Sequence, residues 1–380
     1  MSKTRVLLLF GGQSAEHEIS VISARSVYAA IDASRYEVIL VGISRSGQWF
    51  LDDHESALLD QVEVTNDSGV PVQLGAGQRD LITLDGAKPG IGTFDVVFPL
   101  LHGPRGEDGC VQGLLELADA PYVGTGVAAS AVGMDKELSR AVFAHAGLHQ
   151  TDYLVIRRSA WNADRAGVRH HIESVLRYPM FVKPVNLGSS IGISKVRDTE
   201  SLETAMDLAA GYDIKMMVET SVEGARELEC AVLGNEDPKA SVIGEIIPGA
   251  EFYDYTTKYI DDHSQLIVPA DLSDGTRAVI QEMSIDAFRS IDGAGLGRVD
   301  FLLAPSGQVF LNEINTMPGF TPISMYPRLW QASGVEYSAL IDRLIELALD
   351  RHLETQQISC LLYTSPSPRD RSLSRMPSSA

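Results

Sequence analysis

Apolar runs at the start of the chain are separated by an amphipathic segment. Residues 6–10 and 37–43 are apolar and rich in β-branched or leucine side chains, which predicts two buried strands. The segment between them predicts a helix whose core-facing side carries Ile19, Ile22 and Ala30. A strand, helix and strand of this spacing favour parallel pairing through a crossover helix. The sequence therefore predicts an α/β fold with an N-terminal, Rossmann-like parallel sheet.

The same kind of alternation continues along the chain. Residues 95–100 predict another strand, whereas the glycine-rich residues 65–92 predict an irregular surface segment. A helix is predicted over residues 134–146, and strands and helices then alternate up to about residue 214. Four residues of a predicted C-terminal helix fall on one apolar face: Leu340, Ile341, Leu344 and Ala348.

Residues 298–304 and 308–315 predict a β-hairpin joined by a Pro-Ser-Gly turn. Asp300 lies on the first predicted strand. Glu313 and Asn315 lie two residues apart on the second, so their side chains share one face. Two carboxylates and an amide are the hard oxygen ligands that Mg²⁺ prefers.

Arg298 precedes Asp300 by two residues and points to the same side, where a cation suits an anionic transition state. An ordinary hairpin with an Asp–Arg pair is an equally good interpretation of these residues taken alone.

A predicted strand ends at Lys183 and is followed by a loop with two glycines and two serines, residues 188–192. Backbone amides and hydroxyls of such a loop can hold phosphates, with the lysine as a point charge. A mobile hairpin loop is the simpler alternative. The loop is not the Gly-x4-Gly-Lys-Ser motif, and the Gly11-Gly12 turn lacks the full dinucleotide-binding pattern.

Several other polar residues follow predicted strands or open a predicted helix. Glu16 could hold a substrate ammonium or simply compensate a helix dipole. His102 lies in a glycine-rich loop at a sheet edge where ligands bind, or is only a capping histidine. Glu219 and Glu227 could accept hydrogen bonds from adenine and ribose, or be solvated edge charges. The aromatic segment 252–259 is typical of an active-site lid.

Composition narrows the class of protein. The 380 residues exceed one typical core, which predicts two or three domains. A formal net charge of −20 argues against a nucleic-acid surface, and no apolar run approaches the length of a membrane helix. Three widely spaced cysteines fit a reducing cytoplasm without a disulfide framework or zinc site. Residues 357–380 are rich in serine, lack periodicity and resemble vector-derived sequence, so they predict a disordered tail.

Taken together, seven motifs in order make the chain resemble the D-alanine-D-alanine ligases of the ATP-grasp superfamily over about residues 4–354. These motifs are residues 11–20 (GGQSAEHEIS), 102–109 (HGPRGEDG), 134–136 (MDK), 182–192 (VKPVNLGSSIG), 252–259 (FYDYTTKY), 298–300 (RVD) and 312–321 (NEINTMPGFT).

The resemblance implies an N-terminal substrate-binding domain over residues 1–133 and a two-lobed ATP-grasp fold. Its small lobe would span residues 134–215 and its large lobe residues 216–356, with the tail after it. It also implies ATP and D-alanine as substrates, two Mg²⁺ or Mn²⁺ ions, a cytoplasmic homodimer and a role in peptidoglycan synthesis.

Residue roles are implied in the same way. Those for ATP fall on Lys136, Lys183, Ser190, Glu219, Glu227 and Lys258, and those for the two metal ions on Asp300, Glu313 and Asn315. The roles for the first D-alanine and the lid fall on Glu16, His102, Ser189 and Tyr259. Oxyanion stabilisation falls on Arg298 and the Gly319 amide, and binding of the second D-alanine on Ser324 and Met325. The segment from Glu219 to Glu227 is one residue longer than the usual spacing, so the ribose role of Glu227 has less support.

Two rival functions come from other classes. A ligase that forms a D-alanyl-D-lactate ester is disfavoured by Tyr259, because the resemblance places a different residue there in ester-forming relatives. A non-catalytic ATP-binding regulator is disfavoured because the whole set of expected catalytic residues is intact, namely Lys183, Arg298, Asp300, Glu313 and Asn315. ATP turnover that depends on D-alanine separates an enzyme from a regulator.

Overall fold

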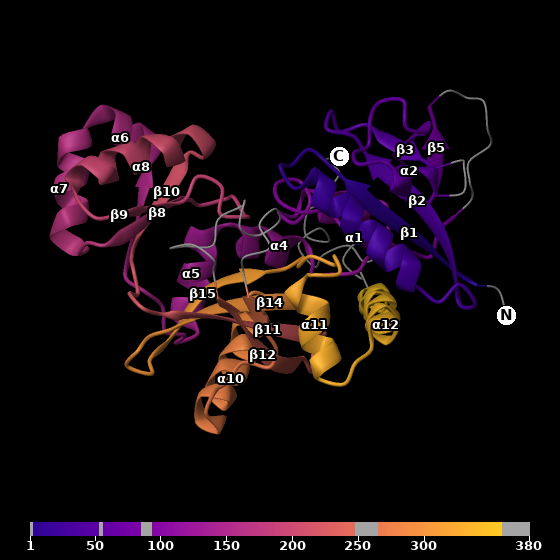
Figure 1. Cartoon of the computed structure of the whole chain (residues 1–380). Helices are drawn as coiled ribbons and strands as arrows, with labels where there is room; N and C mark the ends of the chain where they lie inside the picture. The colour runs from indigo at the N-terminus through magenta and orange to yellow at the C-terminus, as the bar shows by residue number, and fades with distance from the viewer. Residues whose placement is uncertain (1–2, 53–55, 85–92, 248–264, 359–380) are drawn as a thin grey trace, which may run out of the picture.

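The computed structural model describes residues 3–52, 56–84, 93–247 and 265–358. Their strands form three sheets, which Figure 1 shows as two upper groups on either side of a lower one. The N-terminal sheet lies on one side, a four-stranded sheet on the other, and a five-stranded sheet below and between them. The α/β character predicted from the sequence is confirmed.

The N-terminal sheet has the strand order β5-β4-β3-β2-β1-β6. Its strands are β1 (Thr4–Gly11), β2 (Tyr36–Ile43), β3 (Trp49–Leu51), β4 (Val70–Leu74), β5 (Leu81–Thr83) and β6 (Val96–Pro99). The helices of this part are α1 (His17–Ala30), α2 (Ala57–Asp60) and α3 (Cys110–Leu117). β1 pairs in parallel with both β2 and β6, which confirms the predicted parallel core.

An antiparallel extension completes this sheet, because β3, β4 and β5 pair antiparallel in succession after β2. The prediction that residues 65–92 are irregular was therefore wrong for β4 and β5. Val70 and Val72 are buried on one side of β4, the period of two that marks a half-buried strand. The surrounding glycines hid this short alternation in the sequence.

Helix α1 packs on β1, but with a different face from the predicted one. Val21, Ala24 and Val27 are buried, whereas Ile22 is 39% exposed. Ile19 and Ala30 are only partly buried. Two serines, Ser20 and Ser23, share the buried face, and the Ser20 hydroxyl donates to the Leu100 carbonyl. Because the serine hydroxyls find partners, small polar side chains take positions that the apolar pattern assigned to isoleucine.

The four-stranded sheet has the order β7-β10-β8-β9 and is antiparallel throughout. It follows helices α4 (Val127–Met134) and α5 (Lys136–His145). Its own elements are β7 (Tyr153–Arg157), α6 (Arg158–Ala163), α7 (Arg165–Val175), β8 (Met180–Pro184), β9 (Ser194–Val196), α8 (Thr199–Tyr212) and β10 (Lys215–Thr220). This is the predicted order of strand, helix, strand, loop, strand and helix. Trp161, Met206 and Val218 belong to its separate apolar core.

The five-stranded sheet has the order β13-β12-β11-β14-β15. Its elements are β11 (Arg226–Gly234), β12 (Lys239–Ile247), β13 (Gln265–Ile267), α10 (Asp274–Ser290), β14 (Gly295–Leu303), β15 (Val309–Asn315), α11 (Met325–Ala332) and α12 (Tyr337–Gln356). β14 and β15 form the predicted hairpin. Leu340, Ile341, Leu344 and Ala348 of α12 are buried as predicted.

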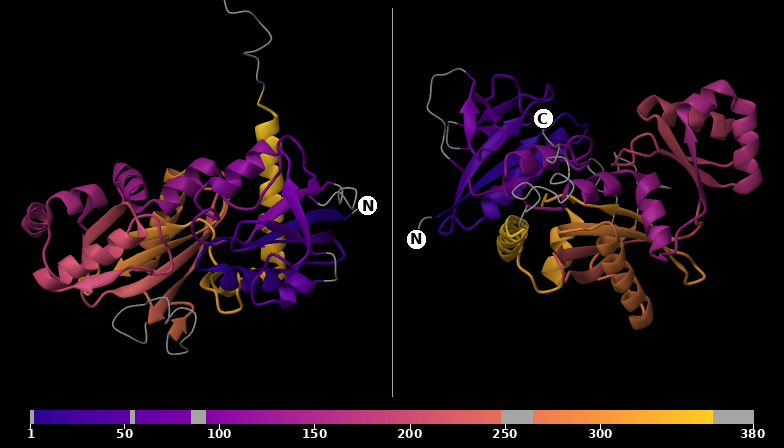
Figure 2. Two further views of the ribbon diagram at one scale, coloured as in Figure 1. Left: turned by 90° about the horizontal axis from the view of Figure 1, so that it is seen from above. Right: turned by 180° about the vertical axis from the view of Figure 1, so that it is seen from behind.

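Helix α12 joins the N-terminal sheet to the five-stranded sheet. Figure 2, seen from above, shows it as the long yellow helix between these two parts. One apolar cluster contains Val6 and Phe10 of β1 together with Leu344 of α12 and Phe320. This shared core fixes the N-terminal sheet against the five-stranded sheet. Among the described residues, no helix is long and apolar enough to cross a membrane.

Candidate active site

A cavity of about 150 Å³ lies where the four-stranded and five-stranded sheets face each other. Its walls include eight of the residues that the sequence singled out: Lys136, Lys183, Ser189, Ser190, Glu219, Glu227, Asp300 and Glu313. They come from α5, β8, the following loop, β10, β11, β14 and β15. A second cavity of about 40 Å³ is also lined by Lys136 and Glu313 and adds Asn315.

The β14–β15 hairpin presents the predicted oxygen ligands. Asp300 pairs with Glu313 across the hairpin, and Arg298 pairs with Asn315. The register shifts after Asp300, so the hairpin contains a β-bulge next to the site. Bulges of this kind re-aim side chains and are frequent beside active sites.

Arg298 and Asp300 form a bidentate ion pair, with both nitrogen–oxygen distances 2.7 Å. The Arg298 Nε atom also lies 3.1 Å from the Glu229 carboxylate. Burial opposes the charged form, but Asp300 and Glu229 outweigh it and raise the pKa of Arg298 well above its usual value. The Asp–Arg pair expected of an ordinary hairpin is therefore present, and it lies on the same face as the predicted oxygen ligands.

The oxygen set fits a hard divalent cation only in part. Within the described ranges, no group of three His, Cys, Asp or Glu side chains could hold a metal ion alone. The Asn315 Oδ1 atom accepts a hydrogen bond from the Met317 amide at 3.0 Å and keeps a second lone pair. Mg²⁺ is usually held by one or two carboxylates together with substrate phosphates and water. Asp300, Glu313 and Asn315 match that incomplete protein set.

Two lysines face the same cavity. Lys136 Nζ donates to the Leu187 carbonyl at 2.9 Å and lies 3.4 Å from the Glu313 carboxylate. Lys183, the last but one residue of β8, forms an ion pair with Glu219. Burial lowers the pKa of Lys183, although the Glu219 charge opposes this effect. Both ammonium groups are therefore placed to meet an anion in the cavity.

Glu219 of β10 is buried between two cations. One carboxylate oxygen pairs with Lys183 and the other with Arg140 of α5, which also donates to the Thr151 hydroxyl at 2.9 Å. Burial raises the pKa of Glu219, but Lys183 and Arg140 outweigh burial and lower it. The sequence did not indicate Arg140, because an arginine inside an amphipathic helix is usually solvated. Glu227 of β11 lines the same cavity from the opposite sheet.

Glu16 and Ser189 come from distant segments and meet in the structure. Glu16 precedes α1 and is buried, and it accepts a hydrogen bond from the Ser189 hydroxyl. This contact joins two of the residues to which the resemblance gave roles for the first D-alanine and the lid. His102 is also buried, with Nδ1 3.2 Å from the Met317 carbonyl. Burial lowers the pKa of His102, although Glu16 opposes this effect.

The remaining predicted residues lie before and at the start of α11. The Ser324 hydroxyl accepts from the Thr321 amide at 3.0 Å, and Met325 is buried. A Cβ atom at Gly319 would lie 2.7 Å from Ser324 Oγ, so a larger residue there would displace the Ser324 hydroxyl. Lys258 and Tyr259 of the predicted lid lie outside the described residues.

Glu107 is a buried acid that the sequence interpretation missed. Its carboxylate accepts a hydrogen bond from the Gly103 amide at 2.7 Å, and it lines the smaller cavity together with Lys136 and Glu313. Burial, with the nearby Glu16 charge, raises the pKa of Glu107 to about 8. The signal was available, since Glu107 lies in the same glycine-rich loop as His102.

The raised pKa of Glu107 predicts a pH-dependent stability. In the unfolded chain this acid has a pKa of 4.5, so its contribution is fully present below that pH and is lost as pH rises through about 8. We expect Glu107→Gln to become more stable than the wild type as pH rises from about 5 to 9. Urea denaturation across that range measures the difference. Glu282→Gln, on the exposed side of α10, is the control. A wild type and Glu107→Gln variant with parallel pH profiles would contradict the ionisation argument.

The comparisons with known proteins agree along almost the whole chain. Family models described as "D-ala D-ala ligase N-terminus" and "D-ala D-ala ligase C-terminus" match residues 5–125 and 142–346. The chain is 47% identical over 363 residues to a D-alanine–D-alanine ligase of Bacillus cytotoxicus, covering 94% of this chain and 99% of that one. It is 48% identical over 362 residues to the ligase of Geobacillus thermodenitrificans, covering 94% of this chain and 98% of that one.

Solved structures give the same picture. The D-alanine-D-alanine ligase from Coxiella burnetii superposes with a TM-score of 0.82 at 38% identity, covering 94% of this chain and 97% of that one. The VanG D-Ala:D-Ser ligase from Enterococcus faecalis superposes with a TM-score of 0.81 at 34% identity, covering 91% of this chain and 100% of that one.

Proposed function

The chain belongs to the D-alanine-D-alanine ligase family, and on that premise we propose that it joins two D-alanine molecules to D-alanyl-D-alanine for peptidoglycan synthesis. The reaction consumes ATP and forms ADP. The observation that carries the proposal is that the Glu16–Ser189 pair, two lysines and a hairpin with three oxygen ligands surround neighbouring cavities. The fold is that of the ATP-grasp ligases.

The chemistry explains why such a site needs phosphate and metal ligands together. A carboxylate is a poor electrophile, so ATP must first convert it into an acyl phosphate. Lys136, Lys183 and Ser190 hold the ATP phosphates, while Glu219 and Glu227 face adenine and ribose. Asp300, Glu313 and Asn315 would hold two Mg²⁺ or Mn²⁺ ions, which supply charge neutralisation at the transferred phosphoryl group.

The second half of the reaction is amide formation. The free amine of the second D-alanine, held at Ser324 and Met325, attacks the carbonyl carbon of the acyl phosphate and gives a tetrahedral oxyanion. This intermediate collapses to the amide as the carbon–oxygen bond to phosphate breaks, so inorganic phosphate leaves and the nitrogen loses a proton. Arg298 and the Gly319 amide stabilise that oxyanion. Glu16 holds the ammonium of the first D-alanine, and His102 lies near its carboxylate. Because acyl phosphates hydrolyse easily, the lid with Lys258 and Tyr259 must exclude water.

The proposal also covers the organisation of the molecule. Residues 1–133 bind substrate, and residues 134–215 and 216–356 form the two ATP-grasp lobes. We expect a homodimer that works in the cytoplasm. β10 (Lys215–Thr220) is still part of the four-stranded sheet, and β11, which begins at Arg226, is part of the five-stranded sheet. The chain therefore passes from one sheet to the other between residues 220 and 226, shortly after the proposed lobe limit.

A single competition assay tests the function. The protein is given ATP, Mg²⁺ and D-alanine together with D-serine and D-lactate, and the products are identified by mass. We expect D-alanyl-D-alanine to dominate, with one ADP formed for each dipeptide. A dominant D-alanyl-D-serine or D-alanyl-D-lactate product would reassign the second substrate. ATP consumption that is independent of D-alanine would contradict the ligase proposal.

The contact between Glu16 and Ser189 gives a test of the lid. We expect Ser189→Ala to raise the ratio of phosphate released to dipeptide made, because a hydrogen bond to a charged group contributes about 1.5–3 kcal/mol. Loss of this hydrogen bond increases the population of the open state of the lid, so water reaches the acyl phosphate. Tyr259→Phe should act in the same direction. Ser174→Ala, whose hydroxyl only donates within α7, is the control. An unchanged ratio in both site variants would show that these hydroxyls do not hold the lid.

A further inference from the structure

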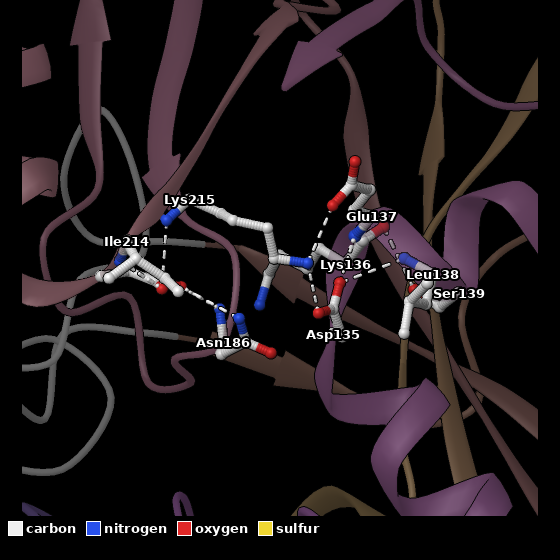
Figure 3. Close-up of polar contacts among 9 residues, drawn as sticks. Asp135, Lys136, Glu137, Leu138, Ser139, Asn186, Ile214 and Lys215 are labelled. Carbon is white, nitrogen blue, oxygen red and sulfur yellow. Dashed lines mark hydrogen bonds and ion pairs between the residues drawn. The ribbon is translucent and has the colours of Figure 1, made fainter. Parts of the chain in front are cut away.

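A polar cluster centred on Asp135, Glu137, Asp213 and Lys215 surrounds the ATP-phosphate lysine, Lys136, and none of these four residues belongs to the proposed site. It joins three segments that are distant in sequence: residues 135–138 at the start of α5, residues 185–187 after β8, and residues 213–215 at the start of β10. Figure 3 shows the Lys215 side chain reaching toward Asp135 and Glu137, with Lys136 between them in sequence.

The Lys215 ammonium is the centre of this cluster. It is largely buried, forms an ion pair with Asp135 and lies 2.8 Å from the Glu137 carboxylate. The other Asp135 oxygen caps α5, accepting from the Glu137 and Leu138 amides at 3.0 and 3.1 Å. The ion pair therefore fixes the first turn of α5, the turn that carries Lys136.

Main-chain bonds connect the same three segments. The Lys136 amide donates to the Val185 carbonyl at 3.2 Å, and the Val185 amide donates to the Lys215 carbonyl at 3.1 Å. The Asp213 carboxylate accepts from the Asn186 amide at 2.7 Å and from the Ile214 amide at 2.6 Å. The segment 185–187 is thus held between α5 and β10 by both main-chain and side-chain bonds.

This segment leads directly into the glycine loop. Lys136 Nζ donates to the Leu187 carbonyl, one residue before Gly188. Ser189 and Ser190 then adopt φ angles of +53° and +56°, which cost energy for residues other than glycine. Such conformations persist only where the surroundings hold them. The cluster holds the N-terminal end of this loop.

We propose that Lys215 is a positioning residue for phosphate binding. Its ion pairs with Asp135 and Glu137 keep Lys136 and the start of the glycine loop in fixed positions relative to each other. The inference rests on the proposed function in one respect, namely that the ligand at Lys136 is the phosphate chain of ATP. Without the ammonium, two carboxylates remain unpaired at the first turn of α5, and both Lys136 and Leu187 lose their fixed places.

The test is equilibrium binding of a non-hydrolysable ATP analogue, AMP-PNP with Mg²⁺, measured by calorimetry. We expect Lys215→Met to raise its Kd about tenfold, which is the size of coupling found between side chains of one network. The Kd for AMP should change less than about twofold, since AMP lacks the β- and γ-phosphates. Lys215→Arg keeps the charge and should remain within about threefold of the wild type for AMP-PNP.

Lys239→Met is the matched control, because Lys239 also begins a strand and pairs with a carboxylate, Asp237, but in an exposed place. If Lys215→Met does not fold, Glu137→Gln removes one partner only and should raise the Kd for AMP-PNP about threefold. The inference is overturned if Lys215→Met lowers the melting temperature but binds AMP-PNP like the wild type, or if AMP and AMP-PNP weaken equally. A wild type that binds AMP-PNP but makes no dipeptide contradicts the proposed function and leaves this comparison valid.

Discussion

Glu313→Gln is expected to lower dipeptide formation about 100-fold or more, since metal ions contribute several kcal/mol to phosphoryl transfer and each 1.36 kcal/mol is tenfold in rate. Glu313 pairs with Asp300 across the hairpin and lies 3.4 Å from Lys136. The substitution keeps the shape of the side chain and removes one negative charge from the oxygen set. Initial rates over a range of Mg²⁺ concentrations measure the effect.

The fold should survive this change, because Glu313 is only partly buried and lines a cavity. Glu236→Gln removes an equal charge at an exposed position and should leave the rate unchanged. The metal assignment fails if Glu313→Gln works at nearly the wild-type rate with the same Mg²⁺ dependence. A melting temperature equal to that of the wild type shows that the loss is not due to unfolding.

Short-range patterns were enough to predict much of the fold. The β14–β15 hairpin was predicted because a turn with proline and glycine separates two apolar runs, and it brings Asp300 opposite Glu313. The parallel pairing of β1 with β2 followed from the length of the crossover. Helix α12 was predicted from the helical spacing of its apolar residues. In each case the signal lies within one segment or between segments that follow each other directly in the sequence.

The predictions that failed depend on what packs against each segment. The buried face of α1 contains Ser20 and Ser23, whose hydroxyls meet partners about 80 residues away. The strand β4 depends on β3 and β5, neither of which is a strong strand by itself. A hydrophobic pattern within one segment carries no information about such partners.

The candidate site also combines features that a local pattern predicts with features that depend on contacts between distant segments. Motifs indicated Lys183 and Glu219 separately, but not that they form one buried ion pair with Arg140. Glu107 and Lys215 were not indicated, because their importance comes only from neighbours on other elements. Charged residues are usually solvated, so a single sequence gives no reason to expect buried ones.

The buried ion pairs of Glu219 lead to the second large effect. Glu219→Gln leaves Lys183 and Arg140, both nearly inaccessible to water, without their shared counter-charge. We expect the free energy of unfolding to fall by about 3–5 kcal/mol, the usual cost of removing one partner of a buried pair. Urea denaturation measures this loss, and ATP-dependent turnover should fall with it because Lys183 lines the cavity.

The pH dependence and a double variant identify the cause. Burial already lowers the pKa of Lys183, and losing Glu219 lowers it further. The folded state then binds fewer protons than the unfolded state at alkaline pH, so stability rises with pH and the loss should be larger near about pH 6 than near about pH 9. Glu219→Gln combined with Lys183→Met should be more stable than Glu219→Gln alone, because it removes one unpaired charge. If the double variant is less stable than Glu219→Gln, or the loss does not change with pH, the unpaired lysine is not the cause.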